Sequence, residues 1–508
     1  MEGWAAIDTS APAGEPHRRP GRVAAPAIAA GLLVAASVPP WGFWVLALAG
    51  LGLLAWRIER LALRARMTVG LLFGLALFGP TLFWISEFHT VGLVALLLLE
   101  ASFFAAACAL VPATPPLTFD QGRRQPALIA LPGALVLAEM ARSAVPFGGL
   151  PMGGIPLGQA GGPLAPAARL GAGLLLTGVT AAAGLAVATA ARRRWRAAGA
   201  LSAVVVAVAG AGLAGADGSG PGLPRGLRTA VVQGGGERGF RAVESDAGAV
   251  LGAHLRVSGN LSPPLDLVLW PENTIDVASL DDTVEAAALS AVAQRLQATV
   301  VAGVTEDVGQ LNFQNVAVAW SPEGQIVDRY VKAKRVPFGE HVPGRRVLER
   351  FVDLSVLPRD AVAGTGPGLL RTPAGDLGVA ISFEVFFASR GRDAARAGAE
   401  ILLVPTNASS FTTSQVPTQE VAAGRLQAWA TGRWVVQSAP TGYGAIIDPE
   451  GHVVGRTTLG RPETLHGRPE LRTGATPYVV VGDAPTVGAA AALLGLAWAL
   501  ARRQDRRP

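Results

Sequence analysis

Long apolar runs dominate the first 216 residues of the chain and return once near its C-terminus. A helix of about 20 apolar residues crosses a bilayer, with a lower limit near 17. We predict eight such helices, although the first two and the last are short and the fifth contains Glu139 and Arg142. They cover residues 23–38, 41–56, 67–85, 91–112, 126–145, 170–191, 197–216 and 487–500.

Between residues 217 and 484 the pattern changes to short β-type runs that alternate with helical runs. The predicted strands are 227–233, 265–270, 299–304, 315–320, 325–331, 377–381, 401–405, 434–437, 445–447 and 478–481, and the predicted helices are 283–297, 386–399 and 418–431. Residues 321–324 and 448–451 have the proline-second, glycine-fourth pattern of a type I turn, so each predicts a hairpin. Strands mixed with helices over this length indicate one layered α/β domain.

The charged residues follow the same division of the chain. The whole chain has 43 basic and 37 acidic side chains, a net charge of +6. Residues 217–484 hold 24 basic and 28 acidic side chains, whereas the rest holds 19 and 9. The excess positive charge therefore belongs to the apolar part of the chain, which favours membrane flanks over a nucleic-acid-binding surface.

Arginines occur in every second loop between the apolar runs. The three short loops on the opposite side contain no arginine. Because positive charge stays on the cytoplasmic side, we expect both termini to be cytoplasmic. The predicted order is a cytoplasmic tail (1–22), a seven-helix membrane domain (23–216), an extracytoplasmic domain (217–484), and a final helix with a basic cytoplasmic tail (485–508). The arginines that set this orientation are Arg18, Arg19, Arg22, Arg57, Arg60, Arg64, Arg66, Arg123, Arg124, Arg192, Arg193, Arg194, Arg196, Arg502, Arg503, Arg506 and Arg507.

Two alternatives concern these basic flanks. A cleavable signal peptide over the first apolar run is one, since Arg22 precedes the run and small residues follow it. A second apolar run begins almost at once, which favours a retained helical hairpin. The arginines at 192–196 are also compatible with a nucleic-acid or lipid-headgroup patch, but a cytoplasmic stop signal explains them sufficiently.

Cysteine and lysine are both scarce, and each absence restricts the chemistry. Cys108 is the single cysteine and lies in an apolar run, so a disulfide or a cysteine-based metal site within the chain is excluded. Lysine occurs only at Lys332 and Lys334, against 41 arginines. Burial can lower the pKa of a lysine, whereas arginine stays charged. Retention of lysine here indicates a role that arginine cannot fill, with a chance surface pair as the alternative.

Three segments place reactive groups where a predicted strand ends, which is where α/β sheets build sites. Leu-Val-Leu-Trp-Pro-Glu ends on Glu272, and the segment 330–343 contains Lys332. In the third segment, 377–386, Ser382 lies at the elbow between a strand and a helix, where a hydroxyl can act as a nucleophile. Each signal is weak alone, because a strand-end glutamate is usually solvated and such a serine is more often a helix cap.

Taken together, WPE, YxKxxxVPFGE and an elbow residue followed by aromatic-Glu resemble the carbon–nitrogen hydrolase (nitrilase) superfamily. With the membrane helices, the chain resembles its membrane-embedded branch, the bacterial apolipoprotein N-acyltransferase family. Residues 39–44, 74–84, 407–411 and 441–451 extend the likeness over nearly the whole chain. The resemblance implies a bundle of about eight transmembrane helices and an extracytoplasmic α-β-β-α sandwich.

The resemblance also implies a two-step acyl transfer in the bacterial plasma membrane, with no cofactor and no metal. Glu272 would be the general base, Lys332 would stabilise the oxyanion, and residue 382 would be acylated by a phospholipid. The α-amino group of the diacylglyceryl-cysteine of an apolipoprotein would then accept the acyl chain. Further positions that match the family's site are Glu340, Glu384, Tyr330 and Phe383.

Ser382 departs from this family, whose nucleophile is a cysteine. A thiol is a few per cent ionised at neutral pH, whereas a hydroxyl is much less acidic and needs a stronger base. Two hypotheses follow: an acyltransferase that uses Ser382, or a silent homologue that binds lipoprotein or lipid or scaffolds another membrane enzyme. For the second, a similar domain in some actinobacteria accompanies a polyprenol-phosphate mannose synthase, a membrane glycosyltransferase. A soluble-type amidase with a membrane tether is disfavoured, because one helix would suffice as the tether.

Overall fold

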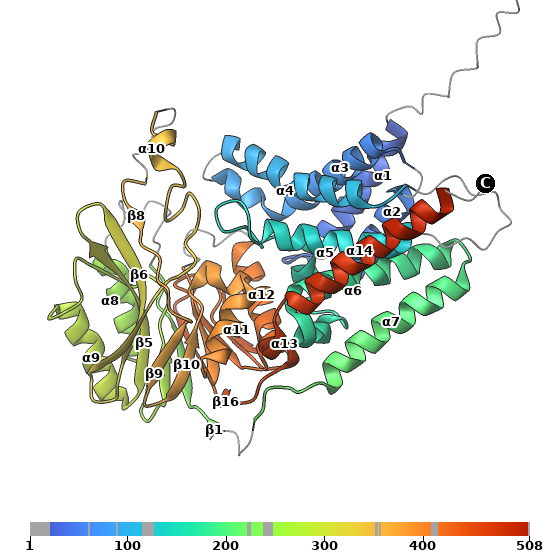
Figure 1. The fold of residues 1–508 in the computed structure, drawn as a ribbon. Coiled ribbons are helices and arrows are strands. Elements are labelled where there is room, and N and C mark those ends of the chain that lie inside the picture. The colour runs from blue at the N-terminus through green and yellow to red at the C-terminus, as the bar shows by residue number, and fades with distance from the viewer. Residues whose placement is uncertain are drawn as a thin grey trace, which may run out of the picture.

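The computed structural model describes residues 21–58, 61–87, 90–113, 126–220, 225–236, 247–350, 354, 357–407 and 415–505. Figure 1 shows a bundle of apolar helices beside a layered α/β domain, joined through α11 (Ala388–Arg396), α12 (Val416–Thr431) and α13 (Pro477–Val481). Several orientation-setting arginines lie outside the described residues: Arg18, Arg19, Arg60, Arg123, Arg124, Arg506 and Arg507. The cytoplasmic orientation of the termini therefore stays a prediction.

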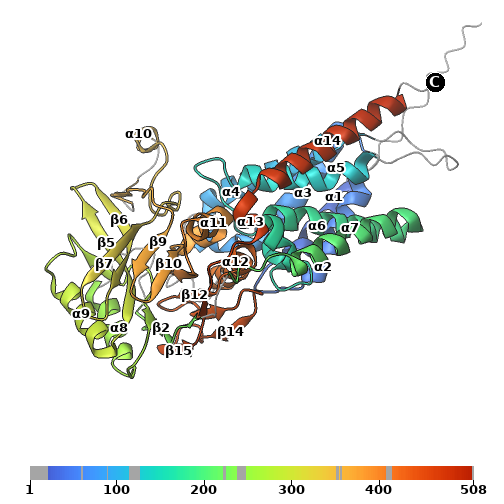
Figure 2. The ribbon, with the colours of Figure 1, turned by 60° about the horizontal axis from the view of Figure 1, so that its bottom comes forward.

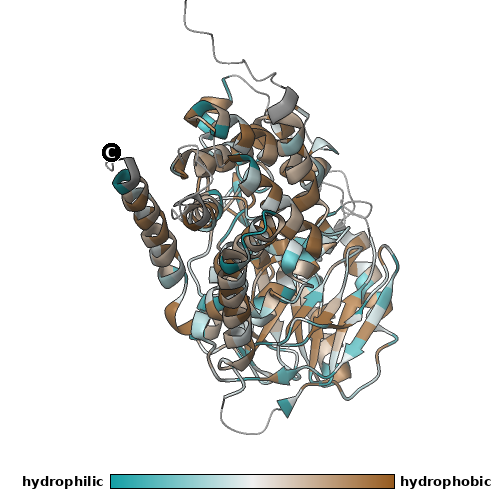
Figure 3. Ribbon diagram, turned by 90° about the vertical axis from the view of Figure 1, so that its right-hand side faces the viewer, coloured by the Kyte–Doolittle hydropathy of each residue, from teal (hydrophilic) through white to brown (hydrophobic). Residues whose placement is uncertain are grey.

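A helix occurs at each predicted apolar run. The helices are α1 (Gly21–Ala35), α2 (Trp44–Ile58), α3 (Leu63–Thr81), α4 (Thr90–Leu110), α5 (Pro126–Arg142), α6 (Ala168–Ala191), α7 (Trp195–Ala214) and α14 (Ala484–Asp505), with 3₁₀ turns η1 (Phe83–Glu87), η2 (Ile155–Gln159) and η3 (Ala165–Ala167). Their surfaces are largely apolar (Figure 3). Within the described residues, five helices (α3, α4, α6, α7 and α14) are long and apolar enough to cross a membrane. The other three are shorter, so a count of eight spans remains a prediction.

The bundle packs through small residues and a buried ion cluster. A Cβ atom on Gly70 would lie 2.4 Å from the Phe104 carbonyl oxygen, and one on Gly74 2.6 Å from Ala101 Cα. This four-residue spacing of glycines lets α3 approach α4 closely, as small residues do in membrane helix pairs. Arg142 on α5 pairs with Glu100 on α4 at 2.6 Å and with Glu139 at 2.9 Å. Pairing of this kind makes charges in an apolar run tolerable, because buried charges are costly unless paired.

The α/β domain contains two main β-sheets, and β1 pairs with β16 apart from them. One sheet has the order β15-β2-β3-β5-β6-β7, with β4 beside β5 and β8 beside β6; the other has the order β14-β13-β12-β11-β10-β9. The strands are β1 (Arg225–Gly226), β2 (Thr229–Gln233), β3 (Leu267–Leu269), β4 (Ile275–Val277), β5 (Thr299–Val308), β6 (Asn312–Trp320), β7 (Ile326–Val331), β8 (Asp360–Ala361), β9 (Leu369–Thr372), β10 (Gly375–Val379), β11 (Ile401–Pro405), β12 (Val435–Ser438), β13 (Ala445–Ile447), β14 (Val453–Arg456), β15 (Glu463–Gly467) and β16 (Glu470–Leu471).

The two sheets pack face to face between helices (Figure 2). Side chains from both sheets, such as Leu269 and Leu403, share one buried cluster. The outer face of the first sheet packs on α8 (Ala247–Ser258) and α9 (Val284–Leu296). The outer face of the second packs on α11 and α12. These layers form an α/β sandwich of the expected α-β-β-α type.

Both predicted hairpins are present, because β6 pairs antiparallel with β7 and β13 with β14. The predicted strand at 478–481 is wrong: these residues belong to α13. Thr476 caps that helix by accepting a hydrogen bond from the Val479 amide at 3.2 Å, and Pro477 occupies its first turn. These start signals outweigh the β-branched valines that follow. The predicted helix at 386–399 is shorter and is preceded by a 3₁₀ turn, η5 (Ser382–Phe386).

Helix α8 and the four-residue α10 (Arg345–Leu348) were not predicted. Most of the family-like segment 407–411 lies outside the described residues. Strands β1, β4, β8, β9, β15 and β16, each two to five residues long, were also not predicted. The other strands and helices differ from the predicted ranges mainly at their ends.

Gln419 on α12 connects the α/β domain to the helical bundle. Its side-chain amide donates to the carbonyl of Thr81 at the end of α3, at 2.9 Å, and its oxygen accepts from the Gly153 amide at 3.1 Å. Gln419 is fully buried. The side chain therefore satisfies two backbone groups of the bundle from within the α/β domain.

We expect Gln419→Ala to lower the free energy of unfolding by about 2 kcal/mol or more. The change leaves the buried Gly153 amide and the buried Thr81 carbonyl without these hydrogen-bond partners. Thermal unfolding of the purified protein in detergent measures the loss. Gln325→Ala, at an exposed glutamine, is the matched control and should stay within about 0.5 kcal/mol of the wild type. Equal losses in the two variants would show that the Gln419 contacts contribute nothing specific.

Candidate active site

A buried lysine directly after β7 lies between two carboxylates, one that follows β3 and one in the loop after β7. Lys332 Nζ is 2.8 Å from Glu272 Oε1 and 2.7 Å from Glu340 Oε1. Asn315 on β6 donates to the same Glu272 oxygen at 2.5 Å. Glu272 and Lys332 are only 3% and 2% exposed. The structure thus brings together three of the residues that the sequence singled out.

The charges in this cluster do not balance, and the imbalance decides its chemistry. Burial alone would lower the pKa of Lys332, but Glu272 and Glu340 outweigh burial and hold this pKa above its usual range. The ammonium group is therefore a fixed cation. Two carboxylates face one cation, and burial raises the pKa of Glu272. A raised pKa makes a carboxylate a stronger base, which suits it to take up a proton.

Ser382 lies at the sharp turn where β10 passes into η5. Its φ angle is +49°, a left-handed conformation that is uncommon for a residue other than glycine. The Ser382 hydroxyl oxygen lies 3.2 Å from the hydroxyl oxygen of Thr406, which follows β11, and 3.5 Å from Glu420 Oε1 on α12. The elbow therefore presents the hydroxyl toward a second polar group, as a nucleophile elbow does.

Glu384 holds the elbow and the lysine segment together. Its carboxylate is fully buried and accepts hydrogen bonds from the Tyr330 hydroxyl and from the amide of Ile381, each at 2.9 Å. It also accepts from the amides of Ala333 and Lys334, both at 2.9 Å. Glu384 thus ties the segment after β7 to the segment after β10, and its oxygens are occupied by structural donors.

Phe383 and Phe387 flank this turn and face the bundle. Their rings meet edge to face at 5.0 Å. Both rings belong to the buried cluster that contains residues of α1, α2, α3, α4 and α5. The Ser382 turn therefore lies at the junction between the α/β domain and the apolar helices.

The cluster of Glu272, Lys332 and Glu340 lies next to the contacts of Ser382, but Ser382 does not join the two. The Glu272 amide donates to the Thr406 carbonyl at 3.4 Å, which brings the two strand ends together. Among the described residues, no hydrogen bond links Ser382 to Glu272 or Lys332; the contacts of its hydroxyl are with Thr406 and Glu420. Sequence reasoning missed Asn315, Thr406 and Glu420, because an isolated polar residue in a strand or helix has no local signature.

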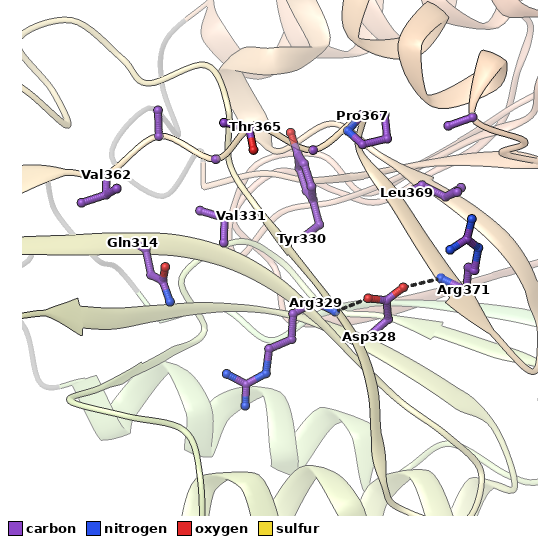
Figure 4. Close-up of a pocket in the computed structure, with 14 residues that line it drawn as sticks. Gln314, Asp328, Arg329, Tyr330, Val331, Val362, Thr365, Pro367, Leu369 and Arg371 are labelled. Atoms are coloured by element: carbon purple, nitrogen blue, oxygen red, sulfur yellow. Dashed lines mark hydrogen bonds between the residues drawn. The ribbon is translucent and has the colours of Figure 1, made fainter.

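A separate pocket of about 630 Å³ lies along β7 and the segment before β9 (Figure 4). Asp328, one of the residues that line it, accepts hydrogen bonds from the backbone amides of Arg371 and Arg329, each at 2.8 Å. Tyr330 is the single member of the predicted site that lines this pocket. In the described ranges, no three His, Cys, Asp or Glu side chains gather so as to hold a metal ion.

Comparison with known families divides the chain in the same way. Residues 30–186 match the family model of the apolipoprotein N-acyltransferase N-terminal domain, and residues 228–468 match that of the carbon-nitrogen hydrolase. Among solved structures, Saccharomyces cerevisiae Nit3, a member of branch 10 of the nitrilase superfamily, aligns at 18% identity with a TM-score of 0.37. That alignment covers 48% of this chain and 90% of that chain.

Two curated relatives align with nearly the full chain. An apolipoprotein N-acyltransferase of Mycolicibacterium smegmatis is 30% identical, over 93% of this chain and 83% of that protein. One of Azotobacter vinelandii is also 30% identical, over 95% of each chain. The motifs at Glu272, Lys332 and Ser382 lie within this shared length. The chain therefore belongs to the apolipoprotein N-acyltransferase family.

Proposed function

We propose that this protein transfers an acyl chain from a phospholipid to the N-terminal diacylglyceryl-cysteine of an apolipoprotein, through an acyl-enzyme on Ser382. The observation that carries the proposal is the buried Glu272–Lys332 pair, with Glu340 on its other side, next to an elbow hydroxyl at a positive φ angle. The related proteins are named as acyltransferases, which supports the reaction class. These names give the scaffold hypothesis no support.

Each group has a role that follows from its charge. Lys332 is a permanent cation in a dry site, so it can stabilise the oxyanion of a tetrahedral intermediate without reorganisation. Glu272, with its raised pKa, can accept a proton from the attacking amine of the acceptor. Asn315 donates to Glu272 Oε1, and Glu340 pairs with Lys332 Nζ. These two contacts keep the base and the lysine in position.

The location of the elbow supports lipid substrates. Phe383, Phe387 and Val416 share a buried apolar cluster with the bundle helices. An ester of a membrane phospholipid needs to reach the nucleophile without leaving an apolar environment. A nucleophile at the junction of bundle and domain meets that requirement, and a soluble amide substrate would not need it.

A serine changes the energetics of the two steps. The acyl group in a phospholipid is an oxygen ester, and so is acyl-serine, so the first transfer exchanges one ester for another. An oxygen ester is less reactive toward amines than a thioester. We therefore infer that the second step limits the rate and that the acyl-serine accumulates.

We expect mass spectrometry to find an acyl adduct on Ser382 after incubation of the protein with phospholipid, and a triacylated product once a diacylated lipopeptide is added. Ser382→Ala should lose both signals. Ser389→Ala, at a nearby serine of α11, is the matched control and should keep both. Absence of adduct and product in the wild type, together with their gain in Ser382→Cys, would overturn the use of serine.

The two lysines provide a second test, because they lie two residues apart but differ in environment. Lys332→Met should lower the rate of lipopeptide acylation by about 10²-fold or more, because it removes the oxyanion partner. Lys332→Arg keeps the charge but should also lose activity, since a guanidinium does not fit the place of a compact ammonium.

Lys334 is the control for both variants, because its ammonium lies over the ring of Phe387, 5.0 Å from the centroid, and not in the carboxylate cluster. Lys334→Met should stay within a few-fold of the wild-type rate. Full activity in Lys332→Arg would contradict the assigned role.

A further inference from the structure

Three buried carboxylates surround the Ser382 elbow, and their contacts separate their roles. Both oxygens of Glu384 accept hydrogen bonds, from Tyr330 and from backbone amides. Glu272 is engaged with Lys332 and Asn315. Glu420 is the remaining one, and in the described part of the chain it is the carboxylate that contacts the Ser382 hydroxyl.

Thr406 lies between Ser382 and Glu420, and its hydroxyl bears on the direction in which each hydroxyl proton points. Its hydroxyl donates to Glu420 Oε1 at 2.5 Å, and its oxygen lies 3.2 Å from the Ser382 oxygen. A threonine hydroxyl has one proton to donate and two lone pairs to accept with. With that proton pointing to Glu420, the Thr406 oxygen is free to accept from the Ser382 hydroxyl at 3.2 Å, a shorter contact than the 3.5 Å from Ser382 to Glu420 Oε1.

We propose that Ser382, Thr406 and Glu420 form a proton relay, in which Glu420 activates the serine that replaces the family's cysteine. This inference rests on the proposed function and adds a second carboxylate to it. Glu420 accepts the proton through Thr406, so Glu420 is a positioning and proton-accepting residue for the nucleophile, while Glu272 serves the acceptor amine.

The surroundings of Glu420 are suited to a group that gains and loses a proton near neutral pH. Burial raises the pKa of Glu420 to about 7, the Thr406 hydrogen bond opposes this, and Glu272 adds to it. Glu420 is 2% exposed, and its Oε2 has no hydrogen-bond partner among the described residues. When a buried carboxylate is hydrogen-bonded on one oxygen only, protonation of the other oxygen stabilises it by removing the buried charge.

The step balances in protons and electrons. The Ser382 proton passes to Thr406 as the Thr406 proton passes to Glu420, and a lone pair on Ser382 Oγ forms the bond to the ester carbonyl. When the tetrahedral intermediate collapses, the bond to the glycerol oxygen breaks. That oxygen leaves as the hydroxyl of a lysophospholipid after taking the proton held by Glu420, which returns to the carboxylate form.

A fluorophosphonate probe tests the relay apart from the lipid reaction. It forms an oxygen–phosphorus bond with an activated serine and releases fluoride, so its rate reports the reactivity of Ser382 without the lipid substrates or the acceptor amine. Full-length Glu420→Gln and Thr406→Val should be labelled at Ser382 about 10²-fold more slowly than the wild type. Thr406→Ser, which keeps a hydroxyl, should restore most of the rate lost in Thr406→Val.

The outcomes separate this inference from the proposed function. Labelling that needs Glu420, without lipopeptide acylation, would support the relay and refute the proposed substrates. Lipopeptide acylation that needs Ser382 but proceeds at the wild-type rate in Glu420→Gln would overturn the relay and leave the proposed function intact. An unlabelled wild-type Ser382 would also overturn the relay.

A thiol in place of the hydroxyl distinguishes proton transfer from a structural role. A thiol has a pKa of about 8.5 and needs little help to ionise, so Glu420→Gln should slow lipopeptide acylation less than about 10-fold in a Ser382→Cys background. An equal loss in both backgrounds would mean that Glu420 only supports the fold. The thermal midpoint of Glu420→Gln, an isosteric change, checks folding directly.

The pH profile provides the last readout. The charged groups that act on Glu420 are Glu272 after β3 and Lys332 after β7, and its hydrogen-bond partners are Thr406 and Ser382. Because the carboxylate is the form that takes up the proton, wild-type labelling should rise as the pH passes about 7. That midpoint should disappear in Glu420→Gln, and its persistence would contradict the proposal.

Discussion

One buried ammonium group holds the candidate active site together. Lys332 pairs with Glu272, which like the lysine is almost fully buried, and with Glu340, which is partly exposed. Buried carboxylates are costly unless a cation and hydrogen bonds compensate them. The two glutamates come from different segments, one after β3 and one in the loop after β7. The pairing with Lys332 therefore fixes how these segments lie, and the positions of Asn315 and of the Glu272 backbone follow from it.

The second sheet contributes the elbow, and Glu384 connects it to the lysine segment. A fully buried carboxylate that accepts from four donors leaves little freedom to the Ser382 turn, which keeps an unfavourable positive φ angle. Strain of this kind persists only where the surroundings over-determine it. The family's thiol needs less activation than a hydroxyl, so a serine here makes the groups around its oxygen more important. Thr406 and Glu420 are the groups that the structure places there.

Helix α12 links this chemistry to the membrane part of the chain. Gln419 binds backbone groups of the bundle, and its neighbour Glu420 reaches the elbow. The same helix packs between the second sheet and the bundle helix α6. Helix α12 thus contacts both the bundle and the groups around Ser382.

The sequence by itself determined the division into apolar helices and a layered domain, because hydrophobic periodicity is a local property. It also pointed to Glu272, Lys332 and Ser382 as candidates, because their three motifs, each weak alone, together resemble those of one family. A local pattern misled at Tyr478, where a threonine cap and a proline start a helix. Only the tertiary structure decided which groups touch. It gave Glu384 a structural role and brought Thr406 and Glu420, from separate segments, to the serine oxygen. Such contacts arise from the packing of two sheets and a helix, which no single stretch of sequence encodes.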